Sequence, residues 1–88
     1  MKISYESSFE KDLKHIKDKK LFARVKQIIE EIKQSDDLDD IKNMKKMKGY
    51  DTFYRIRLGN YRMGIEVVEE EVIITRLLHR KDIYRYFP

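Results

Sequence analysis

Two segments in the second half of the chain alternate apolar and polar residues and are joined by a short link. Residues 52–58 and 61–67 each place an apolar residue at every second position, the period of a half-buried β-strand. Gly59-Asn60 lies between them, and a two-residue connection of this type closes a tight hairpin. The pattern therefore predicts an antiparallel hairpin.

The register of this hairpin follows if the loop consists of those two residues. One face then carries the pairs Leu58–Tyr61, Ile56–Met63 and Tyr54–Ile65. On the other face, Arg57 lies opposite Arg62 and Arg55 lies opposite Gly64. Like charges directly across a ladder destabilise it, so we interpret this face as an anion-binding surface, with phosphate as the first candidate. A glycine in such a face would let a ligand approach the sheet closely.

The first half of the chain has the pattern of one short strand and two helices. Ile3 and Tyr5 alternate with polar neighbours, as in a strand. The run 7–10 fits a capping box, with Ser7 as N-cap and Glu10 three residues later. Apolar residues then recur at helical spacing on both sides of a break near Asp18: Phe9, Leu13 and Ile16, followed by Leu21, Val25, Ile28 and Ile32. This predicts a helical hairpin that ends near residues 34–35.

The remaining segments complete an α+β fold. Residues 36–40 form an acidic connector, and the spacing of Ile41, Met44 and Met47 is too sparse to define a structure. Residues 72–78 are mostly apolar, which predicts an interior strand, and 81–87 predict a short helix. We therefore predict an N-terminal strand, a helical hairpin, a three-stranded antiparallel sheet (four strands in all) and a short C-terminal helix. The helices would cover the Ile56 face and leave the arginine face open.

Composition narrows this picture to one small basic domain. The 88 residues carry a net charge of +4 and form a single domain, residues 1–88. There is no cysteine, no signal-peptide pattern and no stretch of membrane-spanning length, so we expect a cytoplasmic protein with no membrane partner. Acidic residues concentrate between positions 30 and 40, whereas basic residues concentrate between 45 and 62 and near the C-terminus.

A second group of candidate residues follows the last predicted strand. His79 adjoins Arg80 where the chain leaves the sheet, a position suited to general acid or base chemistry. Tyr84 lies four residues after Arg80, so a helix would direct both to one face. Phe53 is the aromatic residue on the arginine side that could stack on a base. Two histidines and no cysteine give no metal constellation.

Three motifs resemble those of the RelE/ParE superfamily of toxins. They are the runs Lys-Met-Lys-Gly at 46–49, Tyr-Arg-Ile-Arg-Leu-Gly-Asn-Tyr-Arg at 54–62 and Leu-His-Arg-Lys-Asp-Ile-Tyr at 78–84. The resemblance covers essentially the whole chain and is closest to the RelE-like branch of archaea and cyanobacteria. It implies a toxin of a type II toxin–antitoxin system that cleaves messenger RNA in the ribosomal A site without a metal or other cofactor. It also implies a cognate antitoxin, RelB-like or other, held in a hetero-oligomer with the toxin.

The resemblance also assigns roles to individual residues. It matches Arg62, Arg80 and Tyr84 to motif positions of the family, and Arg55 and Arg57 to the basic residues of its strand. Together with residues chosen from their own chemistry, the candidate catalytic residues are Arg62, Arg80, Tyr84 and His79, and the candidate phosphate- and RNA-binding residues are Arg55, Arg57, Lys46, Lys48 and Phe53. Arginine remains protonated, so proton transfer falls to His79 or Tyr84, and the sequence leaves both open. Two other functions also remain open: a ParE-like inhibitor of DNA gyrase, and a degenerate member that only binds an antitoxin or RNA.

Overall fold

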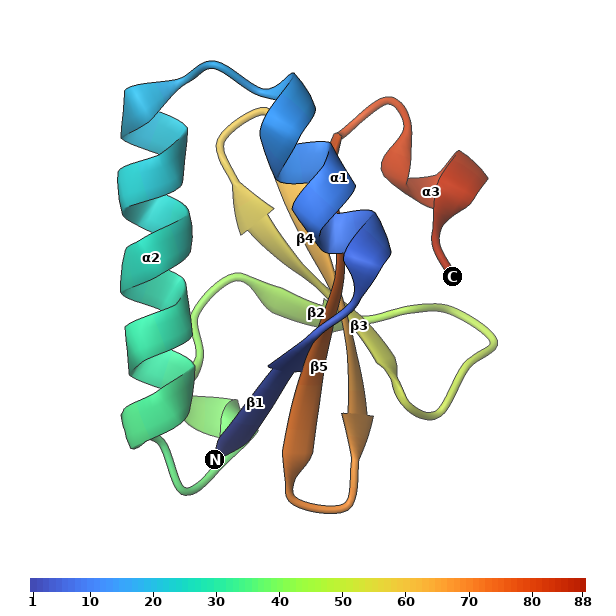
Figure 1. Cartoon of the computed structure of the whole chain (residues 1–88). Helices are drawn as coiled ribbons and strands as arrows, with labels where there is room; N and C mark the ends of the chain where they lie inside the picture. Colours follow the sequence, from blue (N-terminus) through green and yellow to red (C-terminus); the bar gives the residue numbers. More distant parts are fainter.

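A five-stranded β-sheet organises the chain in the computed structural model, which describes residues 1–88 (Figure 1). The strand order is β1-β5-β4-β3-β2, with β1 parallel to β5 and every other pair antiparallel. The strands are β1 (Lys2–Tyr5), β2 (Met44–Lys46), β3 (Phe53–Leu58), β4 (Tyr61–Val68) and β5 (Glu71–His79). The predicted α+β class is confirmed, and β5 is the interior strand that its apolar sequence predicted. The predicted count of four strands is wrong by one.

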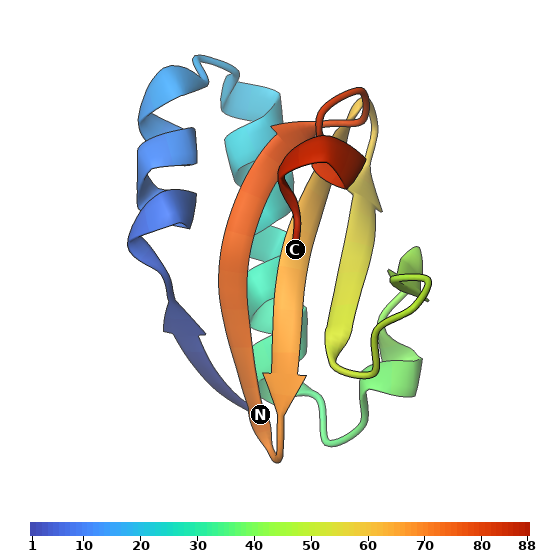
Figure 2. The ribbon, with the colours of Figure 1, turned by 90° about the vertical axis from the view of Figure 1, so that its right-hand side faces the viewer.

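The helices lie on both faces of the sheet. They are α1 (Ser7–His15), α2 (Lys19–Gln34), a 3-10 turn η1 (Leu38–Asp40) and α3 (Ile83–Tyr86). Figure 2 shows α1 and α2 on one side of the sheet and α3 on the other. The helical hairpin and its break are confirmed, because the Asp18 carboxylate accepts the N–H groups of Lys20 and Leu21 and so begins α2. None of these helices combines the length and apolarity needed to cross a bilayer.

The capping box predicted at the start of α1 is wrong. Glu6 is the N-cap residue, and no side chain caps the helix. The hydroxyl of Ser8 instead donates to the Thr75 carbonyl oxygen on β5 at 2.6 Å. Ser8 therefore binds the sheet, and neither serine caps the helix.

The predicted hairpin register is confirmed at every position. Leu58 pairs with Tyr61, Ile56 with Met63 and Tyr54 with Ile65, while Arg57 pairs with Arg62 and Arg55 with Gly64. Ile56, Leu58, Met63 and Ile65 of this ladder are deeply buried beneath α1 and α2, where they join residues of both helices and of β5 in the main core. Tyr54 and Tyr61 are partly buried against them. A slip of one residue would expose this whole apolar set, so burial fixes the register strongly.

The strand that the sequence did not reveal is β2, which pairs with β3 at the sheet edge. Its three residues are too few to show a period. Ile41 belongs to the main core, whereas Met47 belongs to a second cluster with Ile83 and Phe87. The helix-like spacing of Ile41, Met44 and Met47 thus arises because the chain passes from one side of the sheet edge to the other.

The arginine face is only partly open, contrary to prediction. The second cluster, formed by Met47, Ile83 and Phe87 with Phe53 and Leu78 packed against it, lies on this face. α3 and the C-terminal residues therefore cover the middle of the face. The part near the β3–β4 turn remains open, and a separate hollow beside Phe87 is lined by Phe53, Glu66 and Arg76.

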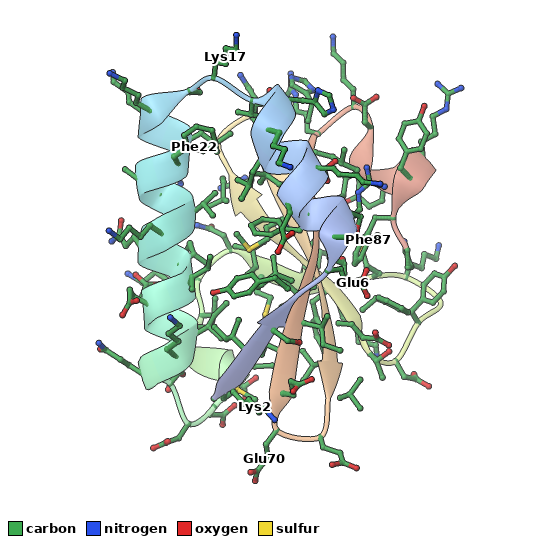
Figure 3. The ribbon with its side chains drawn as sticks, viewed as in Figure 1. Lys2, Glu6, Lys17, Phe22, Glu70 and Phe87 are labelled. Atoms are coloured by element: carbon green, nitrogen blue, oxygen red, sulfur yellow. The ribbon has the colours of Figure 1, made fainter.

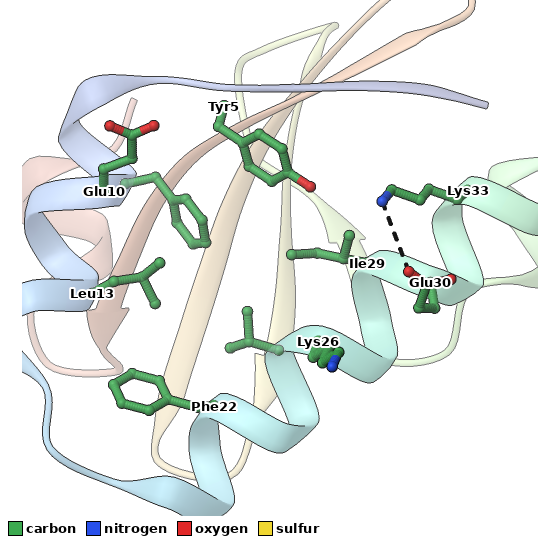
Figure 4. A pocket seen from close by; sticks show the side chains of 10 residues that line it. Tyr5, Glu10, Leu13, Phe22, Lys26, Ile29, Glu30 and Lys33 are labelled. Atoms are coloured by element: carbon green, nitrogen blue, oxygen red, sulfur yellow. Dashed lines mark ion pairs between the residues drawn. The ribbon is translucent and has the colours of Figure 1, made fainter.

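The opposite, helical side carries an apolar groove between α1 and α2 (Figure 4). Its volume is about 590 Å³, and its apolar lining comprises Tyr5, Phe9, Leu13, Phe22, Val25 and Ile29. The charged rim includes Glu30 and Lys33, which form an ion pair at 3.7 Å. The helical hairpin thus packs on the sheet without closing fully on itself.

Helix α1 protects the edge of β5 beyond the short strand β1. β1 pairs only with residues 71–74 of β5. Farther along, the Asp12 carboxylate accepts the Leu77 N–H at 2.9 Å and binds the Arg76 guanidinium through both oxygens at 2.9 and 3.0 Å. This hydrogen bonding raises the pKa of Arg76. Asp12 of α1 therefore accepts a β5 backbone N–H at a point that β1 is too short to cover.

Replacing Asp12 should test this edge contact. We expect Asp12→Ala to lower the free energy of unfolding by about 2 kcal/mol, because it leaves the Leu77 N–H and the Arg76 guanidinium without their acceptor. Urea denaturation followed by circular dichroism would measure the change. Glu10→Ala on the same helix is the control and should change stability by less than about 0.5 kcal/mol, as exposed positions do. Equal effects of the two substitutions would contradict the assignment.

Candidate phosphate-binding site

Three arginines from different elements converge at the β3–β4 turn. Arg57 of β3 and Arg62 of β4 lie directly opposite each other. The Arg80 N–H donates to the Asn60 carbonyl oxygen in the turn at 2.7 Å, which holds the segment after β5 against the hairpin. The structure therefore brings Arg80 to the pair of Arg57 and Arg62 that the sequence had predicted.

Arg62 is held in place by the backbone of the turn. One of its terminal nitrogens donates to the carbonyl oxygens of Gly59 at 2.7 Å and Tyr61 at 2.9 Å. A guanidinium has five N–H donors, and its other nitrogens make no hydrogen bond within the chain. The anchored group can thus offer a fixed set of donors to a bound anion.

The electrostatics of Arg62 show which charges surround it. Partial burial is the largest cause that lowers the pKa of Arg62, and the positive charges of Arg55, Arg57 and Arg80 lower it further. Tyr84 acts in the opposite direction and raises this pKa. The four neighbours therefore lie within electrostatic range of Arg62, and the repulsion among the arginines would be relieved by an anion bound among them.

Tyr84 lies within electrostatic range of Arg62, but not because it shares a helical turn with Arg80 as predicted. α3 begins only at Ile83, so Arg80 and Tyr84 do not belong to one helical turn. The turn at residues 80–82 folds the chain back, and Asp82 N–H donates to the His79 carbonyl oxygen at 2.8 Å. Tyr84 is nevertheless close enough to influence Arg62 and is 67% exposed, so a ligand can reach its hydroxyl.

Arg55 also lies on the arginine face, but its side chain is half-buried. Its Nε is buried without a hydrogen-bond partner, and a terminal nitrogen donates to the Asn43 carbonyl oxygen at 3.3 Å. Lys45 of β2 lies directly opposite it on the same face. Sequence reasoning missed Lys45, because only the pairing of β2 with β3 shows which lysine shares the arginine face.

Three other predicted residues lie away from the arginines. His79 pairs with Tyr61 on the helical face, with ring centroids 5.5 Å apart, and its Nδ1 accepts the Lys81 N–H at 3.1 Å. Lys46 lies opposite Tyr54, also on the helical face, and forms an ion pair with Asp51 at 3.8 Å. Lys48 is exposed in the turn that follows β2.

Phe53 and Gly64 have packing roles in the second cluster. The Phe53 ring makes edge contacts with Phe87 and Tyr50, each with centroids 5.5 Å apart. A Cβ on Gly64 would lie only 2.8 Å from the Phe87 ring. The expectation that Gly64 leaves space for a ligand is therefore wrong, since the C-terminal phenylalanine occupies that space.

The cluster as a whole suits an anion and not a metal ion. Its charged members are arginines and Lys45, all of which are donors without acceptor capacity. Nowhere in the chain do three histidine or carboxylate side chains come together in a way that could hold a metal ion.

Gly64 and Phe87 form a pair that a double-mutant cycle can test. We expect Gly64→Ala to destabilise the protein by about 1–3 kcal/mol, the usual cost of overpacking, because the new methyl group overlaps the Phe87 ring. In a Phe87→Ala background the same substitution should cost less than about 1 kcal/mol, since the overlap is gone. Thermal unfolding of the four proteins would measure this coupling. Equal costs in both backgrounds would contradict the contact.

The fold and the arginine cluster define a small α+β protein whose sheet presents several arginines beside one hairpin turn. A family model described as the ParE toxin of type II toxin–antitoxin systems matches residues 3–84. The chain is 52% identical over 89 residues to Toxin RelE3 of Methanocaldococcus jannaschii, with 100% of both chains covered. It is 32% identical over 73 residues to Putative toxin RelE1 of the same organism, covering 82% of this chain and 80% of that one. The chain thus belongs to the ParE toxin family, within the RelE/ParE superfamily that its motifs indicated, and is a toxin of the type II class.

Solved structures show the same fold. The RelB-RelE antitoxin-toxin complex from Methanococcus jannaschii contains a chain with a TM-score of 0.83 and 48% identity, covering 97% of this chain and 99% of that one. The RelE-RelB complex from Pyrococcus horikoshii gives a TM-score of 0.72 at 20% identity, covering 90% and 93%. The YoeB dimer from Staphylococcus aureus gives 0.73 at 19% identity, covering 91% and 97%. The last two share the fold alone.

Proposed function

We propose that this toxin cleaves messenger RNA on the ribosome, with the scissile phosphate bound among Arg57, Arg62 and Arg80. The observation that carries the proposal is the convergence of these arginines around the anchored Arg62 at the β3–β4 turn. The proposed site of action is the cytoplasm, where translation takes place. A gyrase inhibitor, the activity that the sequence kept as an alternative, would not need a phosphate-directed cluster beside an exposed tyrosine.

The proposed reaction is attack of a ribose 2′-hydroxyl on the adjacent phosphorus. The new O–P bond forms as the bond to the 5′-oxygen breaks, which leaves a 2′,3′-cyclic phosphate and a free 5′-hydroxyl. Negative charge builds on the non-bridging oxygens in the transition state. Arg62 and Arg80 would stabilise that charge, while Arg57 and the half-buried Arg55 hold the phosphate in position.

Proton transfer is assigned to Tyr84. Arginine cannot readily exchange protons, and His79 lies on the helical face with its Nδ1 already accepting the Lys81 N–H. Tyr84 is exposed and within electrostatic range of Arg62. Its hydroxyl is therefore the group best placed to exchange a proton with the attacking or the leaving oxygen.

The proposed partner that restrains the toxin is a cognate antitoxin, forming a hetero-oligomer. Relatives with 48% and 20% identity have been solved as complexes with RelB antitoxins. A protein that cleaves cellular messages must be held inactive until needed, and a partner that covers the arginine cluster would neutralise its repulsion as it blocks RNA.

Removing Arg62 should abolish most of the activity. We expect Arg62→Ala to reduce the rate of message cleavage about 10²–10³-fold, the typical loss when one transition-state donor is removed. Primer extension on messenger RNA in a translating extract would measure the cuts. Lys33→Ala, at the far end of α2, is the matched control and should cleave normally. Intact messages together with inhibited DNA supercoiling by the wild type would instead favour a gyrase target.

Tyr84 and His79 can be separated by substitution. We expect Tyr84→Phe to lower the cleavage rate about 10²-fold or more with unchanged stability, because it removes only an exposed hydroxyl. His79→Gln should change cleavage by only a few-fold but reduce stability, since the ring packs on Tyr61. Single-turnover cleavage across a pH series and thermal unfolding would distinguish the two. A larger rate loss in His79→Gln would reverse the assignment.

A further inference from the structure

The hollow beside Phe87 has a volume of about 340 Å³ and no part in the proposed reaction. Its lining includes Phe53 of β3, Glu66 of β4, Arg76 of β5 and Glu6 at the start of α1. Figure 3 shows Glu6 and Phe87 close to one another beside the sheet. The volume is within the range of small-ligand sites, about 300–1,000 Å³. We therefore examined which groups of the lining are free to bind a ligand.

The hollow contains a half-buried carboxylate that has no cationic partner. Glu66 forms no ion pair, and its side chain accepts one long hydrogen bond, from the Thr52 hydroxyl at 3.5 Å. The exposed Glu6 carboxylate is also without an ion pair and accepts only the Ser8 hydroxyl, at 3.5 Å. Both carboxylates therefore have acceptor oxygens to offer a ligand.

Arg76 adds a donor to the same lining. Its Nε and Nη2 donate to Asp12 at 2.9 and 3.0 Å, which leaves Nη1 without a partner in the chain. Arg76 and Glu66 both line the hollow, but they form no ion pair with each other. A carboxylate and a guanidinium placed in this way can bind a ligand edge that carries both N–H donors and an acceptor.

Aromatic rings form another part of the lining. Phe53 is half-buried, and its ring makes an edge contact with Phe87, with centroids 5.5 Å apart. Tyr86 also lines the hollow and is 52% exposed. Single-stranded nucleic acids are bound by stacking of their bases on aromatic side chains and by hydrogen bonds to the base edges. Both kinds of group are present in this hollow.

The hollow lies on the same ladder as the arginine cluster. Arg57–Arg62 and Phe53–Glu66 are cross-strand pairs of β3 and β4, and Phe87 covers the sheet between them. Four residues of β3 separate the two pairs, which is about 13 Å at about 3.3 Å per residue. A few nucleotides of a single strand can span this distance. Because carboxylates repel phosphate, such a strand would keep its phosphate at the arginines and direct a base into the hollow.

We propose that this hollow is a subsite for a guanine base of the messenger RNA, a few nucleotides from the scissile phosphate. The inference rests on the proposed function. Guanine presents its N1–H and N2 amino group side by side, so both can donate to the Glu66 carboxylate, while its O6 accepts from Arg76. Adenine has an acceptor at N1, which the same carboxylate disfavours. A cationic side chain of a protein partner fits less well, because Arg76 would repel it.

Uncleavable RNA tests the subsite without relying on cleavage. Pentanucleotides of 2′-O-methyluridine, with one guanine or one adenine at each position in turn, lack the attacking hydroxyl. Fluorescence polarisation would measure their binding to the toxin. At the best position we expect guanine to bind about 10-fold more tightly than adenine, the discrimination that one bidentate contact provides.

Replacing Glu66 should remove this preference. We expect Glu66→Gln to reduce the guanine-to-adenine ratio below about 2-fold, because an amide has one acceptor oxygen and cannot accept both guanine donors. Glu70→Gln makes the same charge change in the exposed β4–β5 turn and should keep the wild-type ratio. Circular dichroism would establish that both variants are folded.

The outcomes separate this inference from the proposed function. If the wild type prefers guanine through Glu66 but cuts no message in a translating extract, the subsite stands and the proposed cleavage falls. If it cuts messages but shows no preference for guanine, or if Glu66→Gln retains the preference, the subsite alone is overturned. Titration with N-acetyl-arginine amide, followed by the amide resonances of Phe53 and Thr75, is the last comparison. Shifts with this compound and none with guanosine monophosphate would overturn the subsite in favour of a peptide partner.

Discussion

The pairing of Arg57 with Arg62 across the β3–β4 hairpin is the constraint on which the site depends. The ladder could avoid this repulsion only by shifting register, but such a shift would expose Ile56, Met63 and Ile65, each of which is 0% exposed. Burying such side chains is worth about 1.5–3 kcal/mol each, more than the cost of a solvated pair of like charges. The core on one face therefore holds the cations together on the other. The Arg80 N–H donates to the Asn60 carbonyl oxygen in the turn of the same hairpin. The positions of all three arginines therefore depend on the register that the core fixes.

The C-terminal segment covers the middle of the arginine face and so reduces the area that a ligand can contact. Phe87 fills the space above Gly64, and Ile83 and Met47 complete the cluster beside it. The part of the face near the turn, where Arg57 and Arg62 lie, stays open to an anion. The same packing places Tyr84 within range of Arg62. One small apolar cluster thus covers the middle of the face and fixes α3, the helix that carries Tyr84, the side chain proposed to transfer a proton.

The sequence predicted those parts of the fold that local rules determine. A two-residue turn and a period of two specify the β3–β4 register completely, so the facing arginines follow from the order of the residues alone. β2 could not be found, because three residues at a sheet edge show no period, and Lys45 was therefore passed over in favour of Lys46. The packing of Phe87 on Gly64 was equally hidden, since it joins two distant residues through a fold-back of the C-terminus that no local pattern encodes. Apart from the local capping box at residues 7–10, the errors of prediction thus fall on contacts between distant segments.

Two kinds of cation lie at the end of the molecule that carries the β3–β4 turn, and they differ in how firmly the chain holds them. Arg62 is fixed by two carbonyl oxygens, and Arg55 is partly buried with one donor bonded to Asn43. Such groups need little reorganisation when charge develops on a phosphate, and this is what lowers a barrier. Lys14, Lys17, Lys19 and Lys20, around the connection between α1 and α2, are instead exposed and form no ion pair, so their charges are not held at fixed points. The glutamates at positions 69–71 lie around the β4–β5 turn, at the opposite end of the molecule (Figure 1). Under the proposed function, the field of the molecule would therefore turn the arginines of the β3–β4 turn toward an RNA before any specific contact forms.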